Sequence, residues 1–277
     1  LGLKLAMFPL HMWLPGAYAN APTMVTVFLA STATKAALYL LLRFAFTVFD
    51  VSFEYVIVML TYVVTALGMT GMVLASMQAI FQTDARRTLA YSSIAQVGYM
   101  LLGIGIGTAA GLSASYLHMI NHAIIKGGLF LAMGAFWYRF GITRVSDFNG
   151  LSKIMPWTMG AFTVSGLSLI GVPFTAGFVS KVNLTLAAID KGWWWAVMVI
   201  VAASILAIIY IGRLLLAAYF QSPPEVNGEV VAKNEAPLMM LIPMWILVLL
   251  SIAIGVNADA VTEAARGAAS VLIGGGL

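Results

Sequence analysis

Uncharged apolar runs that are long enough to cross a lipid bilayer recur along this sequence of 277 residues. A transmembrane helix needs about 20 consecutive apolar residues, and residues 237–256 form one such run. Hydrophobic residues make up 62% of the chain and charged residues only 9%, whereas soluble domains carry roughly 25% charged residues. Because alternating ten-residue strand patterns are absent, the sequence predicts an all-α integral membrane protein rather than a β-barrel.

Eight hydrophobic segments are expected to form transmembrane helices, and two of these contain helix-breaking residues. The first is interrupted by Pro9 and Pro15, and the sixth contains Gly171-Val-Pro173. The sixth would be roughly 50 Å long as a straight helix, against a hydrocarbon core of about 30 Å. Since proline removes a helical hydrogen bond and clashes with the preceding turn, we expect both segments to be broken. The eight segments cover approximately residues 1–13, 22–43, 53–81, 85–106, 111–138, 156–189, 192–219 and 237–256.

Two broken helices, each with a lysine, in corresponding halves of a chain are typical of inverted-repeat transporters. We therefore expect this chain to correspond to the second half of such a fold. Residues 1–43 would end the first repeat, with a broken helix and a lysine-bearing helix. Residues 44–220 would form the second repeat, and residues 221–277 would provide a polar loop, the last transmembrane helix and a tail with a surface helix.

Lysines within apolar stretches are the most unusual feature of the composition. All ten acidic residues lie outside these stretches. A lysine at the centre of a bilayer costs on the order of 2.5–3.5 kcal/mol, so several without a carboxylate partner indicate protonatable groups that move charge. Four of the seven lysines are of this kind: Lys4, Lys35, Lys126 and Lys181.

The densest group of protonatable residues lies in the fifth segment. Spacings of four place His118, His122 and Lys126 on one face of a helix. Histidine titrates near neutral pH, so a row of this kind predicts a proton relay. The structural alternative is that the histidines satisfy backbone carbonyls in a bundle core. Asn121 lies off this face, and the spacing gives it no role.

For the remaining candidates, a structural role competes with a functional one to different degrees. Lys181 follows the break in the sixth segment and would reach a membrane face if the break lies near one. Lys4 is close to the start of the sequence and would merely flank a helix end. Lys35 lies among small residues, too deep to reach the surface, which favours a functional role. His11 follows Pro9 and is expected to hydrogen-bond carbonyls freed by the kink.

Several kinds of chemistry are disfavoured by the residues available. The chain has no cysteine, which removes disulfides, thiolate metal sites and iron–sulfur ligation. We expect no cofactor and no metal, although His118 and His122 leave a haem-binding redox subunit as a remote alternative. The net charge of +4 is not read as a nucleic-acid footprint, because four of the positive charges lie in the apolar stretches.

Loop charges predict the orientation in the membrane. Basic residues concentrate in connections on one side, which the positive-inside rule assigns to the cytoplasm. The chain is therefore expected to be a multi-pass protein of the cell (inner) membrane with its C-terminal tail on the outer face. The cytoplasmic residues are Arg86, Arg87, Arg139, Arg144, Lys153, Arg213 and Lys233, against Arg43, Lys191 and Arg266 on the other side.

These motifs resemble the antiporter-like subunits shared by respiratory complex I and the Mrp-type cation/proton antiporters, and the D-type subunit of the Mrp antiporters is the more similar. The matching motifs occur in order over residues 2–181. They are Gly2-Leu-Lys4 with Phe8 to Pro15 and Ala21-Pro22-Thr23, Ala33-Thr-Lys35, Asp84 to Gly98, His118 to Lys126, and Gly171 to Lys181.

The resemblance implies a fourteen-helix fold of two inverted five-helix repeats with helices seven and twelve broken, of which this chain begins inside helix seven. Lys4 and Lys35 would be the lysines of helices seven and eight. His118, His122 and Lys126 would form the central relay, and Lys181 the outer lysine. The family pairs the helix-seven lysine with a glutamate on helix five, which this sequence lacks, so a carboxylate-bearing N-terminal half or separate chain is expected.

The implied function is proton or cation/proton translocation by a subunit of a multisubunit Mrp-type antiporter. The alternative is a proton-pumping membrane subunit of an NADH-quinone oxidoreductase-like complex, in which case it would belong to a translocating enzyme without carrying catalytic residues itself. The expected partners are other membrane subunits, the lipid bilayer, protons and Na⁺ as a candidate coupled ion, with no nucleic acid.

Overall fold

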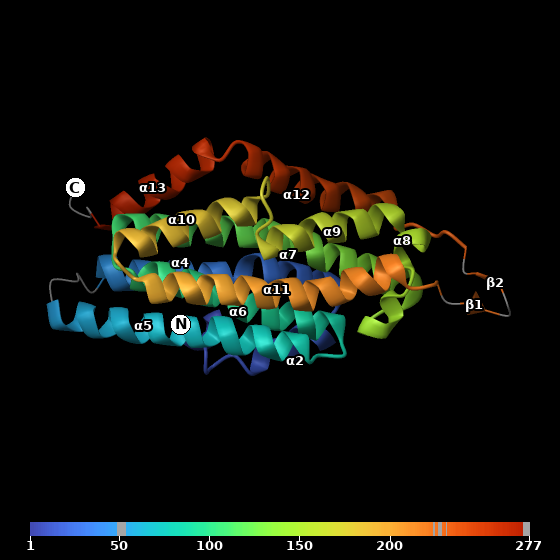
Figure 1. The fold of residues 1–277 in the computed structure, drawn as a ribbon, viewed down its shortest axis with the longest axis horizontal. Helices are drawn as coiled ribbons and strands as arrows, with labels where there is room; N and C mark the ends of the chain where they lie inside the picture. The colour runs from blue at the N-terminus through green and yellow to red at the C-terminus, as the bar shows by residue number, and fades with distance from the viewer. Residues whose placement is uncertain (49–53, 224, 227–228, 231, 274–277) are drawn as a thin grey trace.

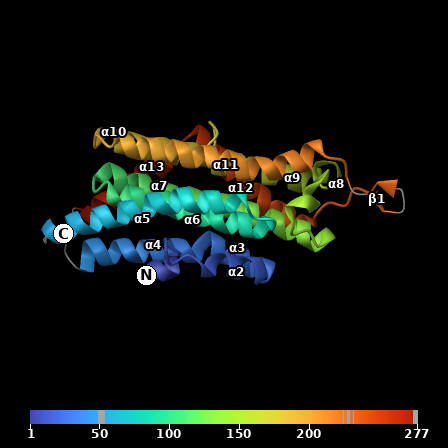
Figure 2. The same cartoon turned by 60° about the horizontal axis from the view of Figure 1, so that its bottom comes forward.

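The computed structural model describes all residues except 49–53, 224, 227–228, 231 and 274–277. The chain forms an elongated bundle of helices that run roughly along one long axis (Figures 1 and 2). Among the described residues, five helical segments are long and apolar enough to cross a membrane: Thr23–Val48, Thr61–Ile80, Ala109–Phe140, Trp194–Phe220 and Leu238–Val256. The predicted all-α membrane architecture is therefore confirmed.

The described helices match the predicted segments in part, with additional short helices and π-helical segments, and residues 13–20 are helical beyond the predicted end of the first segment. They are α1 (Gly2–Leu5), α2 (Trp13–Asn20), α3 (Thr23–Phe28), η1 (Leu29–Ala33), α4 (Thr34–Arg43), η2 (Phe44–Val48), α5 (Glu54–Ile80), α6 (Ala85–Gly105), α7 (Ala109–Phe140), η3 (Val145–Phe148), α8 (Leu151–Ile154), α9 (Pro156–Ile170), α10 (Ala176–Asp190), α11 (Trp194–Phe220), α12 (Leu238–Val256) and α13 (Asp259–Ile273).

Two helices, α6 and α7, form the buried centre of the bundle. The Asp84 carboxylate caps the start of α6 by accepting a hydrogen bond from the Arg87 amide at 2.9 Å. A Cβ atom on Gly98 would collide with the Gly68 carbonyl, so glycine is required where α5 and α6 touch. α7 packs against α6, α9, α10, α12 and α13, which explains why its side chains are shielded on nearly every face.

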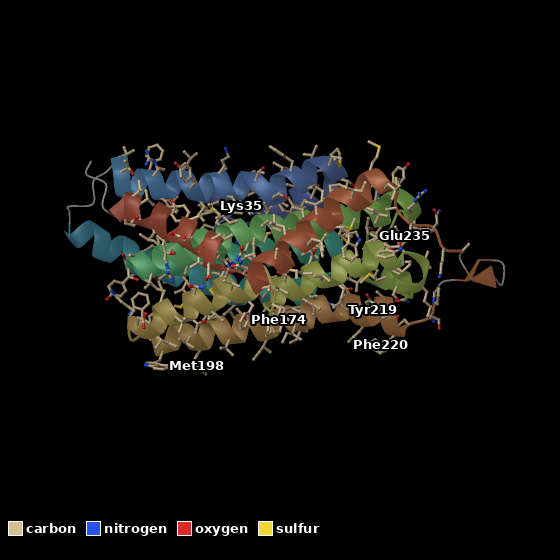
Figure 3. The ribbon with its side chains drawn as sticks, turned by 90° about the horizontal axis from the view of Figure 1, so that it is seen from above. Lys35, Phe174, Met198, Tyr219, Phe220 and Glu235 are labelled. Atoms are coloured by element: carbon tan, nitrogen blue, oxygen red, sulfur yellow. The ribbon has the colours of Figure 1, made fainter. Side chains whose placement is uncertain are left out.

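The predicted break in the sixth segment is confirmed. Gly171 ends α9 in the left-handed conformation with φ of 94°, which glycine adopts without steric cost. Four more residues follow before α10 begins at Ala176. Figure 3 shows Phe174, in this connection, between Met198 toward one end of the bundle and Glu235 toward the other. The break therefore lies near the middle of the long axis rather than at an end of the bundle, with the Phe174 side chain exposed on the flank.

The first segment is also interrupted, but only one of its two prolines contributes. Pro9 lies between α1 and α2, whereas Pro15 lies within the first turn of α2. The expectation that Pro15 breaks the helix was wrong, because a proline in the first turn sacrifices no intrahelical hydrogen bond. The second segment is less regular than expected, since the π-helix η1 (Leu29–Ala33) separates α3 from α4.

The C-terminal part returns along the bundle. The polar connection after α11 contains a short hairpin of β1 (Glu225–Val226) and β2 (Glu229–Val230), which the sequence did not predict. The expected helix after Asn257 is present as α13, and it packs against α7 with Ala265, Ala269 and Leu272 buried. In Figure 1, α12 and α13 cover one side of the bundle in succession.

Glu235 joins the last connection to the broken helix. Its carboxylate accepts hydrogen bonds from the Trp157 amide at 2.6 Å and the Thr158 hydroxyl at 2.7 Å. A carboxylate at this position satisfies free N–H groups of α9 and opposes the positive end of the helix dipole. α9 is thereby held by the segment that leads into α12.

We predict that Glu235→Ala lowers the free energy of unfolding by about 1–2 kcal/mol, the usual cost of losing a helix cap. Thermal unfolding of the purified protein in detergent measures the change. Glu263→Ala is the matched control, because Glu263 is an exposed residue of α13. Equal effects of the two substitutions would contradict the capping role.

Candidate functional site

The structure confirms that His118, His122 and Lys126 share one buried face of α7. Their exposed fractions are 2%, 1% and 0%. The two imidazole rings are almost parallel, with centroids 6.3 Å apart. Three titratable side chains are thus aligned on α7 in the buried centre of the protein.

His118 is held from two sides by helices that meet α7. Its Nε2 lies 2.9 Å from Gln96 Oε1 on α6, and its Nδ1 lies 2.9 Å from Ser180 Oγ on α10. An amide oxygen can only accept a hydrogen bond. His118 Nε2 therefore donates, and in the neutral ring Nδ1 accepts from Ser180. The two contacts together select one tautomer of the imidazole.

His122 has a contrasting environment. Neither of its ring nitrogens has a hydrogen-bond partner among the residues that the structure describes. It lies within electrostatic reach of Lys35, Lys126 and His118. His122 is therefore the relay member whose nitrogens are not committed to protein groups.

Lys126 is fully buried, and its hydrogen bonds go only to neutral oxygen atoms. Its Nζ donates to the Leu89 carbonyl at 2.8 Å and to the Ser92 hydroxyl at 2.5 Å, both on α6. Ser92 and Ser93 also donate to the same carbonyl. A buried ammonium group is tolerable only when hydrogen bonds replace its lost hydration. The polar start of α6 supplies that replacement.

Lys181 reaches back across the helix break. Its Nζ donates to the Leu169 carbonyl at 3.1 Å, to the Ile170 carbonyl at 2.8 Å and to Ser204 Oγ at 3.2 Å. The two carbonyls belong to the last turn of α9, where no following helical N–H donates to them and the helix dipole favours a cation. Three acceptors match the three donors of an ammonium group.

The Lys35 amine is also held by a backbone carbonyl, in this case from a π-helix rather than from a helix end. It is 7% exposed, and its Nζ donates to the Ala30 carbonyl within the π-helix η1. Its side chain lies at the inner part of the bundle (Figure 3). Lys35 is thus one of three buried lysine amines that are held by backbone carbonyls.

Lys4 is the one predicted site residue that the structure does not bring into this group. It lies in α1 with an exposed side chain. His11 is buried at 3% exposure and stacks on Phe8, but neither of its ring nitrogens has a partner among the described residues. The expectation that His11 hydrogen-bonds freed carbonyls was therefore wrong.

Several residues that contact the relay were missed by the sequence reasoning. Asn121 does have a role, since its Nδ2 donates to the Ala176 carbonyl at 2.6 Å and thereby ties α7 to the start of α10. Tyr99 lies between two relay members, with its ring 5.4 Å from the His118 ring and 4.8 Å from Lys181 Nζ. Its hydroxyl is 3.1 Å from Ser204 Oγ, which also meets Lys181.

A signal for some of these residues was present in the sequence. Ser92, Gln96 and Tyr99 follow the spacing i, i+4, i+7 within an otherwise apolar stretch, which places them on one face of α6. That face is directed toward α7, where the three side chains contact Lys126 and His118. A polar stripe on a buried helix predicts a polar partner on its neighbour.

The site is poorly suited to a metal or a haem. Among the residues that the structure describes, no group of three His, Cys, Asp or Glu side chains could hold a metal ion. Both nitrogens of His118 already have protein partners. These contacts weigh against His118 as a haem ligand, since an axial ligand needs a free imidazole nitrogen, whereas both nitrogens of His122 are without a partner among the described residues.

We predict that Gln96→Leu abolishes the tautomer preference of His118. With only three histidines in the chain, ¹⁵N-histidine labelling and solid-state NMR can resolve each imidazole. The wild type should show one Nε2-protonated ring that becomes a mixture in the variant. Gln78→Leu, on α5, is the control. An unchanged His118 spectrum in Gln96→Leu would show that this contact does not set the tautomer.

Comparison with known proteins gives a consistent family. Residues 1–207 match the family model described as NADH:quinone oxidoreductase/Mrp antiporter, transmembrane. The chain is 38% identical over 256 residues to NADH-quinone oxidoreductase subunit N of Desulforudis audaxviator, covering 89% of this chain and 51% of that protein. It is 29% identical over 263 residues to the D-type subunit of the Na(+)/H(+) antiporter of Alkalihalophilus pseudofirmus, covering 94% and 52%.

Solved structures agree with the sequence matches. A chain of the Mrp complex from Dietzia sp. superimposes with a TM-score of 0.89 at 27% identity, covering 98% of this chain and 57% of that one. The chain thus spans about half the length of the relatives it matches. With the family model matching residues 1–207, the protein belongs to the NADH:quinone oxidoreductase/Mrp antiporter transmembrane family.

Proposed function

We propose that this chain carries protons across a membrane as the C-terminal half of an antiporter-like subunit within a multisubunit complex. The observation that carries the proposal is the group of three buried lysines and two buried histidines on α4, α7 and α10. Among the described residues, none of these lysines contacts a carboxylate. Charges that serve only stability would be paired, whereas groups that exchange protons need partners that hold a cation without neutralising it.

The order of the groups suggests the direction along which protons would pass. The rings of His118 and His122 are stacked 6.3 Å apart, and Tyr99 lies against both the His118 ring and Lys181 Nζ. Because like charges at close range repel strongly in a low-dielectric interior, a proton that arrives at one amine favours release from the next. Protons would then move from Lys35 through the α7 row to Lys181, beside the helix break.

The helix break allows the hydrogen-bond partners of Lys181 to change. Non-helical backbone at membrane depth is tolerated where it is buried in protein or lines a hydrated cavity. Lys181 donates to the last two carbonyls of α9, so a small shift between α9 and α10 would alter its contacts. We propose that this end of the relay controls proton release.

The architecture around the relay follows from the same reasoning. We propose eight transmembrane segments corresponding to the second half of an inverted-repeat fold, with 1–43 ending the first repeat, 44–220 forming the second and 221–277 completing the bundle. Lys4 is exposed beside exposed apolar residues of the same region, including Leu3 and Met12. This surface suits a carboxylate-bearing N-terminal half that would complete the relay at Lys4.

The chain is similar both to an antiporter subunit and to an NADH-quinone oxidoreductase subunit, so proton transfer could be driven by a cation gradient or by electron transfer. We propose cation/proton exchange in an Mrp-type complex, with Na⁺ as the candidate coupled ion. The competing assignment is the proton-pumping subunit of a complex related to NADH-quinone oxidoreductase, favoured by the 38% identity to its subunit N. The C-terminal tail would lie on the outer face of the cell membrane in both cases.

We predict that Lys126→Ala or Lys35→Ala reduces proton transport about a hundredfold or more, the usual effect of removing a positioned proton-transfer group. The intact complex reconstituted in vesicles with a pH-sensitive dye measures the flux. Lys191→Ala is the matched control, because Lys191 is exposed at the start of the connection to α11.

Subunit assembly must be intact in each variant for the comparison to hold, and this is checked by size-exclusion chromatography. Normal flux in both assembled relay variants would refute the proposed translocation. An equal loss of flux in Lys191→Ala would show that the effect is not specific to the buried lysines. Imposed Na⁺ gradients applied to the same vesicles distinguish exchange from redox-driven pumping.

A further inference from the structure

A second concentration of unpaired positive charge lies at the end of the bundle that carries the basic loops. A cavity of about 500 Å³ opens there between the α5–α6 connection, η3 and α11. Its lining combines two guanidinium groups with two hydroxyls: Thr83, Arg144, Val145, Ser146 and Arg213. None of these residues contacts the proton relay.

Arg213 is the unusual member, because it belongs to a membrane-spanning helix. It lies seven residues before Phe220, the last residue of α11, which corresponds to about 10 Å along the axis. Its side chain is half-buried. An arginine within a membrane span is rare and normally has a defined partner. Within the described part of the chain, Arg213 forms no ion pair with a carboxylate.

The two nearby carboxylates accept hydrogen bonds from backbone amides and a hydroxyl, and among the described residues neither forms an ion pair with Arg144 or Arg213. Asp147 accepts hydrogen bonds from the Arg144 amide at 3.2 Å and from the Ser146 hydroxyl at 3.0 Å. Asp84 caps α6 through the Arg87 amide. The two guanidinium groups of the cavity therefore keep much of their charge for an external anion.

Apolar stripes lead from the membrane toward this cavity on both flanking helices. On α11, Ile209 and Leu216 are exposed and share a face with Arg213 at spacings of four and three. On α5, Leu74 and Met77 are exposed with the same periodicity as Phe81, just before Thr83. α5 and α11 pack against one another. A basic cavity next to two apolar stripes matches a molecule that has an anionic headgroup and apolar chains.

We propose that this cavity binds the phosphate of an anionic phospholipid. Arg144 and Arg213 would hold the phosphate by charge-assisted hydrogen bonds, and the acyl chains would lie along the exposed stripes of α5 and α11. The cytoplasmic leaflet is the anionic one, and the positive-inside rule places this end of the bundle there. Basic pockets between transmembrane helices on that side are suited to such headgroups.

The test uses the intact complex and native mass spectrometry with defined lipids. Phosphatidylglycerol is titrated against phosphatidylcholine for the wild type and for Arg144→Gln/Arg213→Gln. We expect the wild type to retain phosphatidylglycerol preferentially and the double variant to bind it about 30-fold more weakly, from ~1 kcal/mol for each arginine near the surface. Arg87→Gln is the control, because Arg87 is exposed at the same end outside the cavity.

Two further measurements keep the proposal falsifiable if the double variant is unstable. Arg213→Lys keeps the charge and should retain the preference, and Arg144→Gln changes only an exposed loop residue and should weaken it. Inorganic phosphate added at millimolar concentration should not displace the lipid. Equal retention of both lipids by the wild type, equal loss in Arg87→Gln, or displacement by free phosphate would each overturn a phospholipid site.

Discussion

The structure depends on how buried amines are held without carboxylates. Lys35, Lys126 and Lys181 each donate to at least one backbone carbonyl. A hydrogen bond to a charged group contributes about 1.5–3 kcal/mol, and leaving such a group buried without partners costs considerably more. A carbonyl oxygen stabilises an ammonium group but does not take its proton. The lysines are therefore stabilised inside the bundle without a carboxylate, as the proposed proton transfer requires.

The irregularities of the helices supply several of these carbonyls. A continuous α-helix uses its interior carbonyls for its own hydrogen bonds, so amines need places where that pattern is interrupted. The end of α9 provides two such oxygens for Lys181, and the π-helix η1 provides one for Lys35. The helix break thus connects the fold to the chemistry, since the same Gly-Val-Pro sequence that ends α9 creates the site of Lys181.

The sequence was sufficient for features that depend on local pattern. Spacings of four placed His118, His122 and Lys126 on one face, and Gly171 with Pro173 located the break. The features that it did not reveal arise between helices. The contact of Asn121 with Ala176 and the position of Tyr99 beside Lys181 depend on how α6, α7, α10 and α11 pack, which no single-helix periodicity encodes.

Two features within single helices were also predicted incorrectly from the sequence. The π-helix η1 has no distinct sequence signature, because its residues are compatible with an ordinary α-helix and the extra residue per turn is imposed by packing. The role of Pro15 was misjudged because the start of α2 was not located, and a proline in the first turn does not break a helix. Helix boundaries therefore limited the sequence reasoning more than helix identity did.

The central claim is that the buried lysines are held by neutral oxygen atoms within a hydrated path. A cryo-electron microscopy map of the intact complex that resolves ordered water tests it most directly. The account predicts carbonyl or hydroxyl oxygens around the Nζ atoms of Lys126 and Lys181, with water molecules joining them to the histidine row. A carboxylate from another chain paired with either amine, or a dry apolar gap between the amines and the histidines, would contradict it.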